Sequence, residues 1–186
     1  MKISSFVLYI ALGLSANIAA ATDMAQIAEM REGDMKKLVL YTEPAAAIST
    51  PFTGADGSEM SLAQYGGKYV LLNLWATWCA PCRKEMPMLS ELQTELGSDR
   101  FEVVTIATGR NAPPAMKKFF DEIGVDNLPL HRDPKSQLAR DMGVFGLPAT
   151  VILDPEGREL ARMTGDANWS SDNAKAILAA IIGDEE

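Results

Sequence analysis

A single stretch in the middle of the chain most constrains the fold. The mostly apolar run Tyr69–Trp75 leads directly into Cys79 and Cys82, the only two cysteines of the protein. A run that is apolar at both odd and even positions indicates a strand buried on both faces. Apolar residues at helical spacing follow between Met86 and Leu96. The pattern therefore predicts a strand that feeds a dithiol on the first turn of a helix.

The location of the two cysteines points to thiolate chemistry. Only the thiolate attacks a disulfide, and an ordinary cysteine has a pKa of about 8.5. The free N–H groups and the dipole at a helix N-terminus favour the anion. Pro81 suits the first turn of such a helix, and Arg83 and Lys84 add positive charge beside it. We expect Cys79 to be the exposed, acidic thiol and Cys82 to lie beneath it as the resolving thiol.

A purely structural disulfide and a zinc site both fit the cysteine pair less well. A structural disulfide stabilises most when it closes a long loop, and these cysteines are only two residues apart. A zinc site needs further ligands, and the single histidine, His131, is the only other strong candidate. A CxxC pair beside a β-α-β pattern instead favours redox chemistry. We expect no metal and no organic cofactor.

Composition limits the size and the partners of the molecule. The chain has 186 residues, of which 47% are hydrophobic and 23% are charged, as expected for one globular domain. The net charge of −8 argues against nucleic acid and anionic membrane surfaces as partners. We expect a monomer.

The N-terminal 21 residues have the pattern of an export signal. Lys2 precedes the apolar run Ile3–Leu14, and Ala19–Ala21 offers a cleavage site. An uncleaved anchor is the alternative, because residues 3–21 are about long enough to cross a bilayer. Either way, the domain is expected in the periplasm or on the extracytoplasmic side of the inner membrane. Residues 22–49 are expected to be a helical or linker segment, and residues 50–186 the folded domain.

The rest of the chain alternates strands and helices. The sequence predicts a β-hairpin over 51–60 and, after the strand 69–75, further strands at 101–107, 128–131, 149–153 and 159–163. Helices are expected from the dithiol to about residue 96 and at 113–123, 135–142 and 172–182. This order predicts an α/β fold with a central sheet covered by helices on both faces.

The string Trp75-Ala76-Thr77-Trp78-Cys79-Ala80-Pro81-Cys82-Arg83-Lys84-Glu85-Met86-Pro87, together with Leu147-Pro148-Ala149-Thr150, resembles the thioredoxin superfamily. With the signal sequence, the N-terminal hairpin and an α-β insertion near 113–131, the chain is similar to exported TlpA/ResA-type thiol–disulfide oxidoreductases. The resemblance covers about residues 50–183 and implies a thioredoxin-like fold with a mixed sheet.

The resemblance also implies roles for individual residues. Cys79 would be the attacking cysteine and Cys82 the resolving one, and the two would form the redox disulfide. Pro148 would be the family's cis-proline, which faces the dithiol and helps to align an incoming peptide. Trp78 and Pro81 would lie on the rim that meets the substrate.

One position departs from the pattern of cytosolic thioredoxin. Asn73 stands where that pattern has a buried aspartate that moves protons to and from the resolving cysteine, and an amide cannot titrate. Glu85 lies one helical turn after Cys82 and matches an acidic residue found near the dithiol in many TlpA/ResA-type proteins. We hypothesise that Glu85 exchanges protons with Cys82 and that burial raises its pKa. The alternative is a solvated glutamate in the first turn of the helix.

The predicted function is the reduction of disulfides in exported proteins. By resemblance, a membrane protein would re-reduce the dithiol, and the substrates would be apocytochrome c or copper-site proteins of the respiratory oxidase. Two alternatives stay open: an oxidant of secreted proteins, and a copper chaperone that uses Cys79, Cys82 and methionines of the N-terminal segment. The chaperone has no histidine close to the cysteines in sequence and would have to recruit His131 from the insertion. A peroxidase is a weaker possibility, because it needs threonine and arginine arranged around its reactive cysteine.

Overall fold

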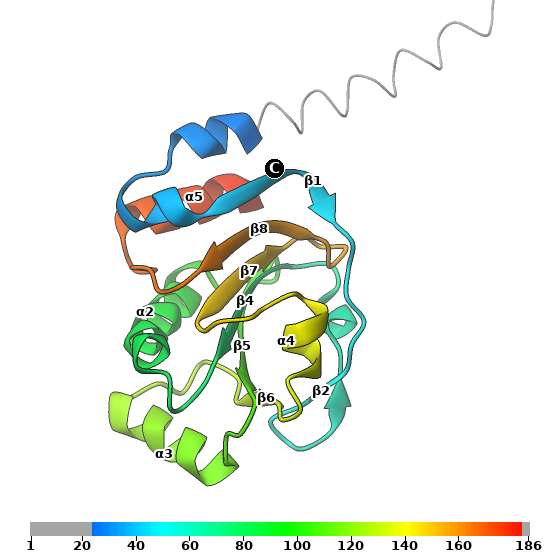
Figure 1. Ribbon diagram of the computed structural model, residues 1–186. Helices are drawn as coiled ribbons and strands as arrows, with labels where there is room; N and C mark the ends of the chain where they lie inside the picture. The colour runs from blue at the N-terminus through cyan, green and yellow to red at the C-terminus, as the bar shows by residue number, and fades with distance from the viewer. Residues whose placement is uncertain (1–23, 184–186) are drawn as a thin grey trace, which may run out of the picture.

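The computed structural model describes residues 24–183, which form a sheet with helices packed against it (Figure 1). The predicted signal segment, residues 1–21, lies outside this range. The sheet has eight strands in the order β1-β8-β7-β4-β5-β6-β2-β3. They are β1 (Val39–Ala45), β2 (Phe52–Thr53), β3 (Glu59–Met60), β4 (Tyr69–Trp75), β5 (Phe101–Thr108), β6 (His131–Asp133), β7 (Ala149–Leu153) and β8 (Glu159–Thr164).

Four α-helices and two short 3-10 helices surround these strands. They are α2 (Ala80–Leu96), α3 (Pro113–Ile123), α4 (Gln137–Asp141), α5 (Asp172–Ile182), η1 (Gly33–Lys37) and η2 (Leu62–Tyr65). Residues 24–29 are also helical. None of the helices in the described part of the chain is long and apolar enough to cross a membrane.

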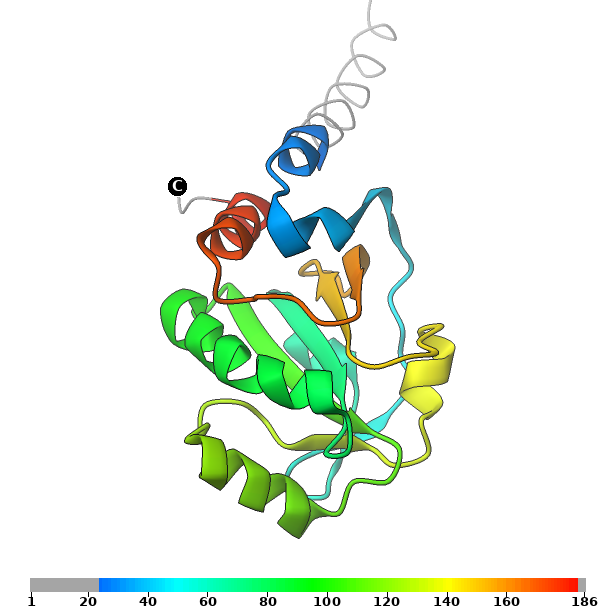
Figure 2. The same ribbon diagram turned by 60° about the vertical axis from the view of Figure 1, so that its left-hand side comes forward.

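The sheet is mixed, as the sequence predicts. Strands β4, β5 and β6 run parallel, whereas β7 pairs with β4, and β8 with β7, in antiparallel fashion. The β2–β3 hairpin joins the far edge through β6. Both faces are covered: α2, α3 and α5 contribute to the hydrophobic cluster on one face and α4 and η2 to the cluster on the other. Figures 1 and 2 show α2 and α3 on one side of the sheet and α4 on the other.

The predicted and observed element bounds agree best where glycine or proline marks an end. Strands β4 and β7 and helices α3 and α5 have the predicted bounds. Helix α2 ends at Leu96, before Gly97, as predicted. The sixth strand lies slightly later than predicted, at His131–Asp133, because its pairing with β5 begins only at Ile106 and His131.

The N-terminal edge of the sheet corrects one expectation. The sequence predicts a helical or linker segment over residues 22–49, but Val39–Ala45 form strand β1, which pairs antiparallel with β8. Met35 and Leu38, just before this strand, are each only 1% exposed. The prediction is wrong here because β1 is an edge strand with an almost wholly exposed pattern, so its sequence shows no apolar alternation. The sheet therefore begins upstream of residue 50.

Candidate active site

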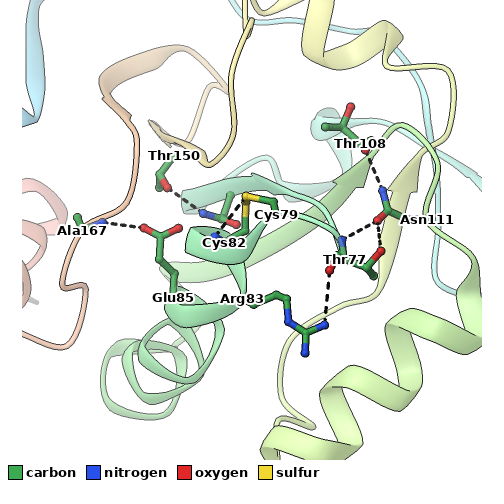
Figure 3. Close-up of a disulfide and its surroundings, with 10 residues drawn as sticks. Thr77, Cys79, Cys82, Arg83, Glu85, Thr108, Asn111, Thr150 and Ala167 are labelled. Atoms are coloured by element: carbon green, nitrogen blue, oxygen red, sulfur yellow. Dashed lines mark hydrogen bonds between the residues drawn. A yellow bond between two sulfur atoms is a disulfide. The ribbon is translucent and has the colours of Figure 1, made fainter.

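The two cysteines lie where strand β4 passes into helix α2 (Figure 3). They form a disulfide, with Cα atoms 5.3 Å apart. Cys79 is the N-cap of α2, and the backbone N–H of Cys82 points at its sulfur at 3.3 Å. Cys82 is fully buried, whereas Cys79 is 5% exposed. The expected asymmetry is present, but Cys79 in the disulfide is nearly buried rather than exposed.

Glu85 lies one turn further along α2 and is only 1% exposed. Its Oε1 accepts hydrogen bonds from the backbone N–H of Ala167 and from the indole N–H of Trp169, both at 2.9 Å. Its Oε2 has no partner among the described residues. Burial raises the pKa of Glu85 to about 7, although the hydrogen bonds from Ala167 and Trp169 oppose the shift. The burial rules out a solvated glutamate and agrees with the hypothesis of a raised pKa.

Asn73 supplies a second buried polar group on the same face of the sheet. It is 0% exposed and donates from Nδ2 to the hydroxyl of Thr150 on the neighbouring strand at 3.0 Å. Its Oδ1, like Oε2 of Glu85, is a buried acceptor that lacks a partner within residues 24–183. Two orphaned acceptors of this kind disfavour the ionised carboxyl, because a proton on Glu85 would supply a donor.

Pro148 lies at the same end of the sheet as the cysteines. The Leu147–Pro148 peptide bond is cis, as predicted. Pro148 immediately precedes β7, whose first residue, Ala149, pairs with Leu74 near the end of β4. The cysteines follow β4 at that same end. The register therefore brings the cis-proline segment and the dithiol to one edge of the sheet.

Two large apolar side chains at this end are open to solvent. Trp78, directly before Cys79, is 67% exposed, which agrees with its expected position on the rim. Pro81 is half-buried in the first turn of α2. Phe145, three residues before Pro148, is 95% exposed. Phe145 is not among the residues expected at the site, because a lone aromatic residue in a loop carries no periodic signal.

His131 lies apart from the cysteines, in a polar cluster near the β2–β3 hairpin. It is 7% exposed, and both ring nitrogens are engaged. Nδ1 accepts from the backbone N–H of Ala55 at 3.1 Å, and Nε2 lies 2.8 Å from the hydroxyl of Tyr65. His131 is therefore not brought together with Cys79 and Cys82. Over residues 24–183 no group of three or more His, Cys, Asp or Glu side chains could hold a metal ion.

The fold and the cysteine pair together define a class. A mixed sheet between helices, a disulfide at the start of α2 and a cis-proline segment beside it are the features of a thioredoxin-like thiol–disulfide oxidoreductase. Residues 42–158 match the model of the AhpC/TSA family. The chain belongs to this family.

Individual relatives narrow the comparison. Over 123 residues the chain is 37% identical to the thiol:disulfide interchange protein HelX of Rhodobacter capsulatus, covering 66% of this chain and 62% of HelX. It is 34% identical to the thiol-disulfide oxidoreductase ResA of Geobacillus thermodenitrificans over 68% of this chain and 70% of that protein. The matched region thus spans less than two thirds of HelX.

The solved structures agree with this comparison. A crystal structure from Chlorobium tepidum, described as a candidate thiol:disulfide interchange protein DsbE, superposes with a TM-score of 0.67 at 26% identity. The match covers 78% of this chain and all of that one. The resemblance to the ResA type that the sequence showed is therefore confirmed.

Proposed function

We propose that this protein is an exported oxidoreductase that reduces disulfides in partner proteins. One observation carries the proposal: the Cys79 sulfur caps α2 and receives the Cys82 N–H, while the second sulfur is fully buried behind it. A helix N-terminus favours the thiolate that attacks a disulfide. The names of HelX and ResA as thiol–disulfide proteins support the same class of reaction.

The reaction proceeds in two exchanges. The Cys79 thiolate attacks one sulfur of the partner disulfide, forms a mixed disulfide and releases a partner thiolate. The Cys82 thiolate then attacks the Cys79 sulfur, which closes the Cys79–Cys82 disulfide and releases the second partner thiolate. Two electrons pass to the partner, and the two thiolates that leave take up protons. An upstream dithiol, carried by a membrane protein, reverses these steps and restores Cys79 and Cys82.

Glu85 is the proton acceptor for the resolving step in this scheme. A cysteine buried as deeply as Cys82 ionises with difficulty, because its thiolate would be desolvated. A carboxyl with a pKa of about 7 can take up or return a proton near neutral pH. Glu85 lies on the same face of α2 as Cys82, one turn away. Its orphaned Oε2 is the atom that would carry the proton.

The substrates follow from the resemblance. The ResA and HelX type points to cysteines of apocytochrome c, or of copper-site proteins, on the extracytoplasmic side of the inner membrane. Trp78 and Pro81 on one side, and the cis-Pro148 segment on the other, form the rim against which an extended peptide would lie. The exposed indole of Trp78 offers that peptide an apolar contact.

The first test is the reduction potential of the Cys79–Cys82 pair, equilibrated in glutathione buffers and followed by tryptophan fluorescence. A value near or below about −200 mV is expected for a reductant that needs a supply of electrons. A value near about −120 mV would instead make the protein an oxidant of secreted proteins and reverse the proposed direction.

The second test concerns the substrate. The reduced Cys82→Ser variant should form a stable mixed disulfide through Cys79 with an oxidised peptide that carries the CxxCH haem-attachment sequence of apocytochrome c. The matched control is a disulfide peptide of the same length and charge without that sequence. Equal trapping of both peptides would contradict a cytochrome c substrate but not the disulfide chemistry.

A further inference from the structure

A tight turn joins strand β4 to the dithiol. The backbone N–H of Cys79 donates to the carbonyl of Ala76 at 3.0 Å, so Thr77 and Trp78 are the two central residues of the turn. Cys79 then begins helix α2 as its N-cap. Because the turn is so short, the orientation of Thr77 determines where Cys79 stands relative to the helix. Any contact that fixes Thr77 also fixes the attacking sulfur.

The side chain of Asn111 makes such a contact. Its Oδ1 accepts two hydrogen bonds from Thr77, one from the backbone N–H at 2.8 Å and one from the hydroxyl at 3.0 Å (Figure 3). On the other side, the guanidinium of Arg83 reaches the carbonyl oxygen of Thr77 at 3.5 Å. That guanidinium also lies 4.0 Å above the ring of Phe119. The backbone N–H, the hydroxyl and the carbonyl of Thr77 thus all form hydrogen bonds with other side chains.

Asn111 is itself anchored in the body of the sheet. It is 8% exposed, and its Nδ2 donates to the carbonyl of Thr108, at the end of β5, at 2.8 Å. The hydroxyl of Thr108 lies 3.2 Å from a carboxylate oxygen of Asp133. The carboxylate of Asp133 in turn accepts from the backbone N–H groups of Gln137 and Ala139 in the first turn of α4. The amide of Asn111 therefore links the end of the sheet to the redox turn.

We propose that Asn111 is a positioning residue of the redox centre, which holds the Ala76–Cys79 turn so that the Cys79 sulfur stays over the N-terminus of α2. This inference rests on the proposed function, since it assigns Asn111 to the same dithiol. The stabilisation of an anion by a helix N-terminus falls off within the first turn. A turn released from Asn111 lets the sulfur move away from the Cys82 N–H, 3.3 Å distant in the disulfide. The thiol pKa of Cys79 then rises, and fewer molecules carry the attacking thiolate at neutral pH.

The test measures how fast iodoacetamide alkylates Cys79 as a function of pH. The Cys82→Ser background leaves one thiol, so the curve reports Cys79 alone. Asn111→Ala should move the midpoint of the curve to higher pH and lower the rate below that midpoint by roughly three- to tenfold. The plateau at high pH should stay unchanged. A loss of stability without a positioning role would leave the midpoint where it is in the parent.

Two control variants separate positioning from general stability. Asn127 is a matched amide that links the middle of α2 to the loop before β6: it accepts from the hydroxyl of Ser90 at 2.7 Å and donates to its carbonyl at 2.9 Å. Asn127→Ala should cost stability and leave the alkylation midpoint unchanged. Thr77→Ser keeps both donors to Asn111 and should behave like the parent protein.

The outcomes are distinguishable from those of the proposed function. A midpoint in Asn111→Ala equal to that of the parent, or an equal shift in Asn127→Ala, overturns the inference. Should Asn111→Ala not fold, Thr77→Val removes only the hydroxyl donor and should shift the midpoint by a smaller amount in the same direction; no shift there also overturns it. Alkylation requires no protein substrate. A wild-type protein that reduces no disulfide would therefore overturn the proposed function and leave this test intact.

Discussion

The two faces of the central sheet are built from the same strands but differ in chemistry. Toward α4 and η2, the central part of strands β4, β5 and β7 presents a cluster of apolar residues: Val70, Leu72, Leu74, Val104, Ile106, Val151 and Leu153. Toward α2, the same three strands carry a row of polar side chains, Thr150, Asn73 and Thr105, each 0% exposed and adjacent in register. Glu85 and the dithiol lie on this second side, with α2.

The difference shows what each face contributes. The apolar cluster is stabilised by burial, and an unpaired polar group within it would cost free energy. Buried polar groups cost free energy unless they are paired, and on the α2 face Asn73 and Glu85 each keep one acceptor without a partner in the described region. The molecule therefore has a local loss of stability at the place where the proposed function requires proton transfer. The following predictions test this contrast, from the largest effect to the smallest.

Cys79→Ser should abolish disulfide reduction and leave the fold intact. Serine cannot form the thiolate nucleophile, and a disulfide that closes so short a loop contributes little to stability. Turnover of an oxidised peptide and circular dichroism would be measured on the same sample. Residual turnover above the uncatalysed rate would contradict the assignment of the attacking sulfur.

Leu72→Ala, on the apolar face, should have the opposite effect: it should lower the stability and leave the disulfide chemistry unchanged. Leu72 is fully buried, so its truncation should destabilise the protein by about 2–5 kcal/mol. Urea denaturation would measure the loss. Below the unfolding transition, the reduction potential and the turnover should equal those of the wild type; a change in either would mean that the two faces are coupled.

Glu85→Gln should remove a pH dependence of stability. The folded-state pKa of about 7 exceeds the usual value of 4.5, so the folded protein binds more protons and its stability falls as the pH rises through that window. The loss for the wild type is on the order of 3 kcal/mol between those two pH values. Glutamine keeps an acceptor for Ala167 and Trp169 and does not titrate.

The measurement is the difference in free energy of unfolding between the two oxidised proteins at about pH 5 and pH 8. The free energy of unfolding of Glu85→Gln should increase relative to that of the wild type as the pH rises. Turnover of the variant should fall, most clearly in the resolution of the mixed disulfide. A constant difference across the range would contradict the raised pKa, and wild-type turnover between about pH 5 and pH 9 would contradict the role in proton transfer.

Thr105→Val should have the smallest effect. Thr105 donates from its hydroxyl to the carbonyl of Pro129, and valine leaves that acceptor unpaired at a cost of about 1–2 kcal/mol. It has no hydrogen bond to Glu85, so the reduction potential should not change. A shifted reduction potential would mean that Thr105 also influences the dithiol, so that buried polar side chains on all three strands affect the redox chemistry.

The sequence predicts the elements of the fold best where local signals agree. Strand β4 is a continuous apolar run, and α3 begins at Pro113 and stops before Gly124. Strand β1 gives no such signal, because pairing with β8 rather than burial of its side chains holds it in place. Pairing between segments more than a hundred residues apart leaves no local pattern in the sequence.

The residues of the site also differ in whether the sequence alone points to them. Cys79, Cys82 and Pro148 stand in short local motifs, and Glu85 follows from helical spacing. Phe145 and Asn111 carry no motif. The role of Asn111 arises only when the loop after β5 folds against a turn 34 residues earlier in the chain. Such contacts depend on the tertiary fold, and a single sequence does not show them.

The burial of Cys82 has a kinetic consequence. Since Cys82 is fully buried and only Cys79 keeps some exposed surface, the electron donor and the electron acceptor must both approach Cys79. The two partners cannot be bound productively at once, so each excludes the other. Steady-state rates should follow a ping-pong scheme, in which the oxidised form of the protein leaves one partner before it meets the next. High concentrations of either partner should inhibit the half-reaction of the other, and the flux should depend on the ratio of the two pools.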